Sequence, residues 1–101
     1  MRILLLEDDQ ILCDSLKEFL ELEGYQVDVA HRGPEVFDLT FTQKYDLYIL
    51  DVNVPENNGF EVLSALKDAG DETPAIYITA LTDINSISKG FAIGAEDYIK
   101  K

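Results

Sequence analysis

Three short apolar runs constrain the fold of this sequence more than any other feature. They are Ile3 to Leu6, Leu47 to Leu50 and Ala75 to Ile78, and a polar residue follows each one. Continuous apolar runs of this length are typical of strands buried on both faces of a parallel sheet. Gln26 to Ala30 and Asp97 to Lys100 are less apolar, which favours strands at the sheet edges. The sequence therefore predicts a parallel sheet with three central and two edge strands.

Helical patterns separate these strands. Apolar residues recur at helical spacing in four stretches, and a glycine suited to a helix C-terminus follows three of them. The stretches are Ile11, Leu12, Leu16, Phe19 and Leu20 before Gly24; Val36, Phe37, Leu39 and Phe41 after Pro34; Phe60, Val62, Leu63 and Leu66 before Gly70; and Ile84, Ile87 and Phe91 between Asp83 and Gly94. Strands and helices are thus expected to alternate along the whole chain.

This alternation predicts a doubly wound α/β fold with right-handed crossovers. With the second and fifth strands at the edges, the strand order that fits is 2-1-3-4-5, which is the flavodoxin-like order. The 101 residues are enough for one domain and no more. In open sheets of this kind, ligands bind outside the carboxyl ends of the strands at the switch point, here between the first and third strands.

Composition narrows the classes of partner. The chain carries 20 acidic and 8 basic residues, a net charge of -12, which repels nucleic acid and anionic lipid. No apolar run approaches the roughly 20 residues that span a bilayer, and the first run is too short for a signal peptide. We therefore expect a cytoplasmic protein with no direct nucleic-acid binding and no membrane contact. Cys13, the only cysteine, excludes an internal disulfide and is expected in the core.

Acidic and hydroxyl side chains gather at the strand ends. These residues are Glu7, Asp8 and Asp9 after the first strand, Asp51 after the third, Thr79 after the fourth, and Tyr98 with Lys101 in and after the fifth. Because adjacent parallel strands lie about 4.8 Å apart, the acids of the first and third strands must converge. Crowded carboxylates repel one another, and a hard cation relieves that repulsion. An all-oxygen site favours Mg²⁺ over zinc or copper.

A magnesium-bound acid cluster beside a hydroxyl and a lysine indicates a phosphoryl-transfer site. Asp51 would be the nucleophile and would form an acyl phosphate. The Lys101 ammonium and the Thr79 hydroxyl would contact the remaining phosphoryl oxygens, and the small side chain of Ala80 would leave room for the group.

Each strand-end residue also has a purely structural interpretation. A single acid at a strand end is usually a solvated loop residue, and only its repetition at four successive strand ends favours function. Asp9 suits both capping of the first helix and an outer-shell contact with the metal. His31, the only histidine, follows an edge strand and is expected to be a surface residue and a poor ligand.

Over its whole length the chain resembles the receiver domain of bacterial two-component response regulators. The resemblance rests on Glu7-Asp8-Asp9 after a leucine-rich run, Asp51 with Pro55 and Gly59, Thr79-Ala80, and the segment Gly94-Ala95-Glu96-Asp97-Tyr98-Ile99-Lys100-Lys101. It implies that Glu7 and Asp8 hold Mg²⁺ together with Asp51 and the backbone carbonyl of Asn53. It also implies that Asp51 accepts a phosphoryl group from the phosphohistidine of a sensor histidine kinase. Thr79 and Tyr98 would be the switch pair, and glutamate at position 7 resembles the winged-helix transcription-factor branch.

Two positions depart from the family pattern. Glu56-Asn57-Asn58 precedes Gly59, whereas family members usually place an acid directly before that glycine. Leu81 is apolar where such positions often carry polar groups that assist the attack of water. These departures bear on the rates of phosphorylation and hydrolysis and leave the chemistry of the site unchanged.

The predicted topology also leaves part of the sheet uncovered. Right-handed crossovers place the first helix on one face and the other three on the opposite face. A single helix about 10 Å wide cannot cover five strands. We expect a bare face over the third to fifth strands, in a receiver domain of residues 1–101 that is truncated before a fifth helix. A homodimer partner, another chain or a rearranged helix would cover that face.

Three other functions fit parts of the sequence. A haloacid-dehalogenase-like phosphatase also uses a strand-end aspartate, but it needs a second acid at the position of Asn53. A flavodoxin-like binder of a phosphate cofactor would be repelled by the acids in the first loop. An interaction module that works without phosphorylation on the same scaffold is the third alternative, and intact Asp51, Thr79 and Lys101 argue against it.

Overall fold

A computed structural model of the chain describes residues 1–52, 58–79 and 97–100. The elements are β1 (Arg2–Leu6), α1 (Gln10–Leu22), β2 (Gln26–Ala30), α2 (Gly33–Thr42), β3 (Leu47–Asp51), α3 (Gly59–Asp68), β4 (Ala75–Thr79) and β5 (Asp97–Lys100). All five predicted strands and the first three predicted helices are present. The helix expected between Asp83 and Gly94 lies outside the described residues.

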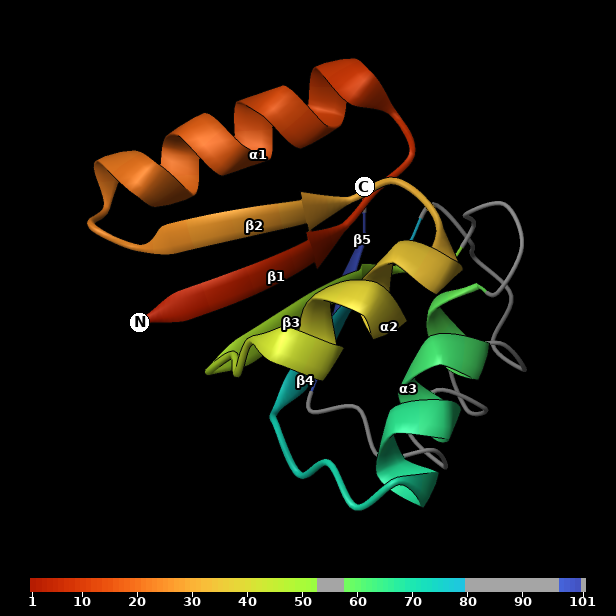
Figure 1. Ribbon diagram of the computed structural model, residues 1–101. Helices are drawn as coiled ribbons and strands as arrows, with labels where there is room; N and C mark the ends of the chain where they lie inside the picture. The colour runs from red at the N-terminus through yellow and green to blue at the C-terminus, as the bar shows by residue number, and fades with distance from the viewer. Residues whose placement is uncertain (53–57, 80–96, 101) are drawn as a thin grey trace.

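The strands form one sheet in the order β2-β1-β3-β4-β5, and each neighbouring pair is parallel. In Figure 1, α1 lies on one side of the sheet and α2 and α3 lie on the other. The predicted flavodoxin-like order is therefore confirmed, with the switch point between β1 and β3.

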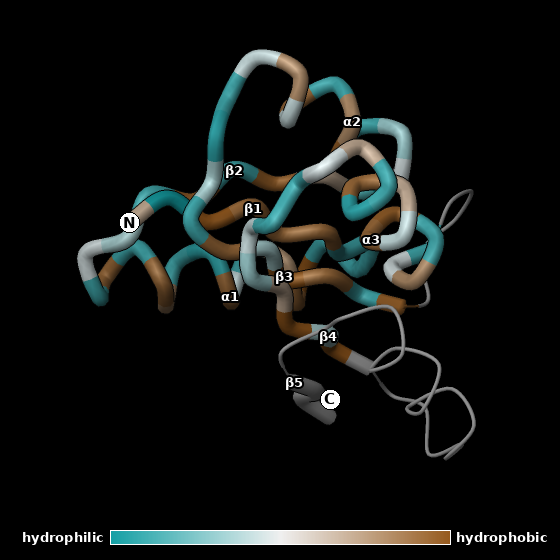
Figure 2. Tube along the Cα trace, turned by 90° about the horizontal axis from the view of Figure 1, so that it is seen from below, coloured by the Kyte–Doolittle hydropathy of each residue, from teal (hydrophilic) through white to brown (hydrophobic). Residues whose placement is uncertain are grey.

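The central strands are apolar throughout because each of their two faces packs against a separate core. The described residues form one hydrophobic cluster that joins Leu4 and Leu6 to side chains of α2 and α3. A second cluster joins Ile3 and Leu5 to Cys13 of α1. Alternate residues of β1 thus point to opposite faces of the sheet, and Figure 2 shows the apolar stretches of β1 and β3 between α1 on one side and α2 on the other. Cys13 is in the core as expected, and burial raises the pKa of its thiol.

Three residues that the helical spacing placed on apolar faces are instead exposed. Ile11, Phe19 and Phe41 have exposed fractions of 81%, 61% and 90%. On α1 the inward direction is set by Cys13, and successive residues turn by about 100°. Ile11, two residues earlier, lies about 200° around the helix from Cys13 and points away from the sheet.

The expected bare face over the third to fifth strands is wrong at two positions of β3 and β4, and the side chains of β5 lie outside the described parts of the chain. Ile49 of β3 and Ile78 of β4 have exposed fractions of 9% and 6%. Both belong to the same cluster as Leu5 and Cys13, so this core extends from beneath α1 across β3 to β4. Leu47 and Ile76, which are also on these strands, are half-buried.

The helix ends follow the sequence signals. Asp9 and Asn58 accept backbone N–H groups at the starts of α1 and α3, and Pro34 lies in the first turn of α2. Gly24 and Gly70 follow α1 and α3 with φ of 96° and 87°, a left-handed conformation that glycine adopts without strain. Both glycines therefore end helices as predicted. Within residues 1–52 and 58–79, no helix is long and apolar enough to cross a membrane.

Candidate functional site

Three carboxylates converge at the switch point of the sheet. Because β1 and β3 are neighbours with Leu6 beside Leu50, the residues that follow them lie next to each other. One carboxylate oxygen from each of Glu7, Asp8 and Asp51 can be chosen so that all three lie within 4.8 Å of one another. Glu7 and Asp51 have an exposed fraction of 0%, whereas Asp8 is exposed. The predicted convergence of the strand-end acids is thus found for these three residues.

Glu7 is held by contacts on its backbone and on its side chain. Its N–H donates to the carbonyl of Ala30 at 3.0 Å, and its own carbonyl lies 3.0 Å from Nδ1 of His31. Its Oε2 accepts the N–H of Asp9 at 3.1 Å. Glu7 is therefore tied to the end of β2 and to the start of α1. The contact with His31 was not foreseen, since nothing in the local sequence signals it.

Asp9 caps α1. Its Oδ1 accepts the N–H groups of Ile11 at 3.0 Å and Leu12 at 3.2 Å. Of the two roles that the sequence left open, the structure therefore favours capping. This cap fixes the direction in which the chain leaves Glu7 and Asp8.

Gly59 allows the start of α3 to lie against the end of β3. A Cβ atom at this position would lie 2.7 Å from the backbone oxygen of Asp51 and 3.3 Å from the Cα of Val52. Contacts below 3.0 Å essentially never occur for a real Cβ, so a side chain here would push on the backbone of Asp51. The sequence reasoning noted Gly59 as a family residue without predicting this packing.

The donor set of the cluster fits a hard divalent cation. In the described residues the cluster consists of carboxylates, with no histidine or cysteine side chain. Mg²⁺ prefers oxygen ligands and keeps several waters, whereas zinc and copper favour nitrogen or sulfur. Two carboxylates buried so close together also create negative charge that a cation would offset.

Comparison with known proteins identifies the family of the chain. The family model of the response regulator receiver domain matches residues 3–101 of the sequence. The chain belongs to the response regulator receiver family. Receiver domains are signalling domains that sensor histidine kinases phosphorylate.

Relatives of this receiver domain agree in sequence and in fold. It is 45% identical to the transcriptional regulatory protein CrdR of Helicobacter pylori, over 99% of this chain and 47% of that protein. A two-component response regulator from Clostridium difficile has a TM-score of 0.95 at 29% identity, covering 100% of this chain and 83% of that one. The regulator TrrA from Thermotoga maritima, solved in complex with Mg(2+)-BeF, has a TM-score of 0.88 at 34% identity, covering 99% and 85%. The chain spans about half the length of the curated relatives it matches.

The remaining predicted site residues of the receiver domain are placed only in part. Thr79 ends β4, and its backbone pairs with that of Lys100 in β5. Tyr98 lies in β5 with its backbone beside that of Tyr77. The side chains of Thr79 and Tyr98 lie outside the described parts. So do three whole residues of the predicted site: Asn53, Ala80 and Lys101.

A second group of polar contacts lies near the amino end of β3. The Tyr48 hydroxyl donates to Oδ2 of Asp71 at 2.5 Å, and the Thr73 N–H donates to Oδ1 at 2.8 Å. Burial opposes ionisation of Asp71, but these hydrogen bonds hold its pKa below the ordinary value. Burial, together with the contact with Asp71, raises the pKa of the Tyr48 hydroxyl. Tyr48 belongs to the core of the receiver domain, whereas Asp71 and Thr73 are half-buried. The group lies toward the end of β3 opposite Asp51.

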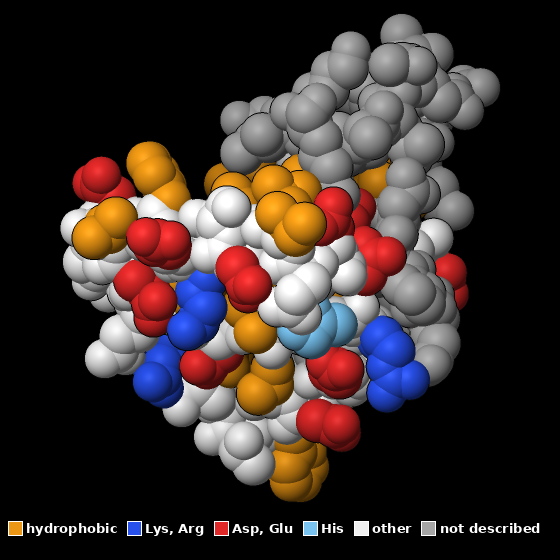
Figure 3. All heavy atoms as spheres, turned by 90° about the horizontal axis from the view of Figure 1, so that it is seen from above, with side chains coloured by type: hydrophobic (Ala, Val, Ile, Leu, Met, Phe, Trp, Pro, Cys, Tyr) orange, Lys and Arg blue, Asp and Glu red, His pale blue; other side chains and the backbone are white. Residues whose placement is uncertain are grey.

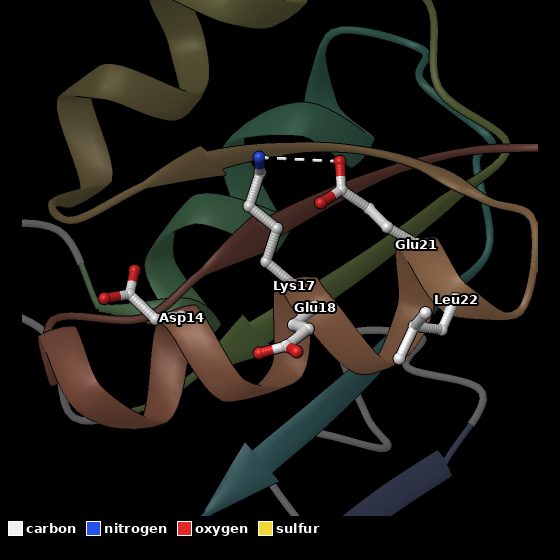
Figure 4. Close-up of a pocket in the computed structure, with 5 residues that line it drawn as sticks. All are labelled: Asp14, Lys17, Glu18, Glu21 and Leu22. Carbon is white, nitrogen blue, oxygen red and sulfur yellow. Dashed lines mark ion pairs between the residues drawn. The ribbon is translucent and has the colours of Figure 1, made fainter.

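The outer surface of α1 offers no comparable site. A shallow hollow there, shown in Figure 4, is lined by residues of this single helix, and its polar groups include the ion pair of Lys17 with Glu21 at 3.5 Å. On the face shown in Figure 3, acidic side chains are widely scattered, whereas Lys and Arg side chains gather in few places. The acid cluster is therefore distinguished by burial and convergence, not by acidity alone.

Proposed function

We propose that Asp51 is the phosphoacceptor of this receiver domain and that Glu7 and Asp8 hold Mg²⁺ beside it. The observation that carries the proposal is the approach of the three carboxylates within 4.8 Å, with Glu7 and Asp51 wholly buried. Two carboxylates buried this close together are unusual, because burial of like charges is costly unless their charge is offset. The phosphoryl donor is the phosphohistidine of a sensor histidine kinase.

In the transfer, a carboxylate oxygen of Asp51 forms a bond to phosphorus. The phosphorus–nitrogen bond of the phosphohistidine breaks, and the imidazole nitrogen keeps its electron pair and takes a proton. The products are an aspartyl phosphate and a neutral histidine. When bound, Mg²⁺ would offset the negative charge on the phosphoryl oxygens. The buried position of Asp51 at the end of β3 holds the nucleophile in one orientation.

The other predicted residues complete the proposed site. The backbone carbonyl of Asn53 provides a further Mg²⁺ ligand, and Thr79, Ala80 and Lys101 surround the phosphoryl group. The position of Thr79 at the end of β4 supports its role, because the β3–β4 register places it one residue past the partner of Asp51. Thr79 and Tyr98 form the switch that reports phosphorylation.

The proposed output is control of transcription in the cytoplasm. This proposal is supported by the names of relatives such as the transcriptional regulatory protein CrdR. The domain itself requires no contact with nucleic acid, and its net charge of -12 disfavours one. Phosphorylation would instead change the conformation of the receiver domain and so alter its effect on an output region.

Intact-mass spectrometry tests this function. The protein is incubated with Mg²⁺ and a small acyl-phosphate donor, and we expect one added phosphoryl group. A parallel sample that contains EDTA in place of Mg²⁺ should gain none. Asp51→Asn is the control for the nucleophile and should remain unmodified. A wild-type protein that is folded by circular dichroism and still gains no phosphoryl group would refute the proposal.

A further inference from the structure

We propose that His31 is a positioning residue for the Mg²⁺ site, and that it acts by holding the backbone of Glu7 through a hydrogen bond. This inference rests on the proposed function, since it assigns the loop of Glu7 and Asp8 to metal binding. His31 is not a ligand in this proposal. It acts through the peptide unit that joins the two acidic residues.

The key contact lies between Nδ1 of His31 and the carbonyl oxygen of Glu7, at 3.0 Å. A carbonyl oxygen can only accept a hydrogen bond, so Nδ1 must carry the hydrogen. The carbonyl of Glu7 belongs to the same peptide unit as the N–H of Asp8. The imidazole therefore fixes the orientation of the peptide plane between two residues of the cluster.

His31 is itself fixed from α2. Its backbone N–H donates to Oε2 of Glu35 at 2.9 Å, and Oε1 of Glu35 lies 3.5 Å from Nε of Arg32. Glu35 lies in the first turn of α2, so a regular element of the fold holds the backbone from which the imidazole extends. His31 is half-buried, so the surface position expected from the sequence is found only in part.

Ala30 and His31 form hydrogen bonds with both backbone polar groups of Glu7. The carbonyl of Ala30 accepts the N–H of Glu7 at 3.0 Å, and the next residue, His31, donates to the Glu7 carbonyl. The N–H of Asp9 then holds the Glu7 carboxylate at 3.1 Å. The end of β2 and the start of α1 thus leave Glu7 little freedom to rotate.

This restraint matters because of what Mg²⁺ requires. The ion demands near-ideal octahedral geometry with short bonds, so ligands that are free to rotate bind it poorly. Groups that orient metal ligands typically contribute about 10- to 100-fold in metal affinity. A single backbone contact at the edge of the site is expected to lie at the lower end of this range, about tenfold.

Two substitutions separate positioning from simple packing. His31→Phe keeps a ring of similar size and removes the donor. His31→Asn removes the ring and keeps an amide N–H at a place close to that of Nδ1. If His31 acts through its hydrogen bond, His31→Phe should weaken Mg²⁺ binding about tenfold and His31→Asn should change it less than about threefold. If only the volume of the ring matters, the order of the two variants is reversed.

Mg²⁺ affinity is measured by isothermal titration calorimetry on the wild type and both variants, without any phosphoryl donor. The unfolding transition of each protein in EDTA provides the structural control. The proposal predicts a loss of affinity in His31→Phe that exceeds any loss of metal-free stability, and recovery in His31→Asn. Equal Mg²⁺ affinity in the wild type and His31→Phe would overturn the role of His31 while leaving the proposed function intact. A folded wild type that binds no Mg²⁺ would overturn both.

Discussion

Replacing Asp51 by asparagine should make the metal-free protein more stable, although it abolishes the proposed chemistry. Glu7 and Asp51 are wholly buried, and their carboxylate oxygens lie within 4.8 Å. At that separation two unit charges repel by about 0.9 kcal/mol in water and by about 3.5 kcal/mol at the effective dielectric constant of about 20 that describes protein sites. Asparagine has nearly the same shape as aspartate and removes one of the charges. We therefore expect the free energy of unfolding in EDTA to rise by about 1–3 kcal/mol.

Mg²⁺ should reduce or reverse this difference in stability. A ligand that binds only the folded state stabilises it by about 2.7 kcal/mol at a hundredfold excess over its dissociation constant. The wild type should gain this stabilisation, and Asp51→Asn should gain much less because it lacks one ligand. The stability of the two proteins should therefore converge or cross as Mg²⁺ is added.

Urea denaturation followed by circular dichroism, in EDTA and in Mg²⁺, measures both effects. Glu18→Gln is a matched control, since it removes the same unit of charge from an exposed position on α1 and should change the stability little. The reasoning would be refuted if Asp51→Asn were no more stable than the wild type in EDTA. It would equally be refuted if both proteins gained the same stability from Mg²⁺.

Substitutions at three further positions test other parts of the structure, each by chemical denaturation. Gly59→Ala should lower the free energy of unfolding by about 1–3 kcal/mol, because the added Cβ overlaps the backbone oxygen of Asp51; an unchanged midpoint would contradict this packing. Asp9→Ala should cost about 1 kcal/mol through loss of the α1 cap, and Asp9→Asn should recover most of the loss. The pKa of the Tyr48 hydroxyl is raised in the folded state above its ordinary value of 10.0. The contribution of the protonated hydroxyl to the free energy of unfolding is therefore complete below pH 10.0 and is lost as the pH rises above it. The wild type should therefore lose more stability than Tyr48→Phe above about pH 10, and parallel profiles would exclude this role of the hydroxyl.

The sheet order and the convergence of the acids could be predicted from sequence because both follow from topology. Apolar runs identified the buried strands, and the two weaker runs identified the edges. Once β1 and β3 are neighbours, Glu7 and Asp51 must meet, whatever the side chains around them do. The position of the site thus required no knowledge of packing.

Features that depend on tertiary packing could not be predicted in this way. Helical spacing alone did not show that Ile11 and Phe41 face outward, because the direction of a helix face is set by contact with the sheet. The contact of His31 with Glu7 joins residues 24 positions apart and has no local signature. The close approach of Gly59 to Asp51 likewise depends on how α3 is placed against β3.

Chemical mapping of the modified residue tests the central claim most directly. After incubation with Mg²⁺ and an acyl-phosphate donor, borohydride reduces an aspartyl phosphate to homoserine, and tandem mass spectrometry of peptides locates the change. We expect homoserine at position 51 in the Mg²⁺ sample and aspartate there in the EDTA sample. Modification at position 7 or 8 instead, or no conversion in a folded protein, would contradict the assignment of Asp51 as the phosphoacceptor.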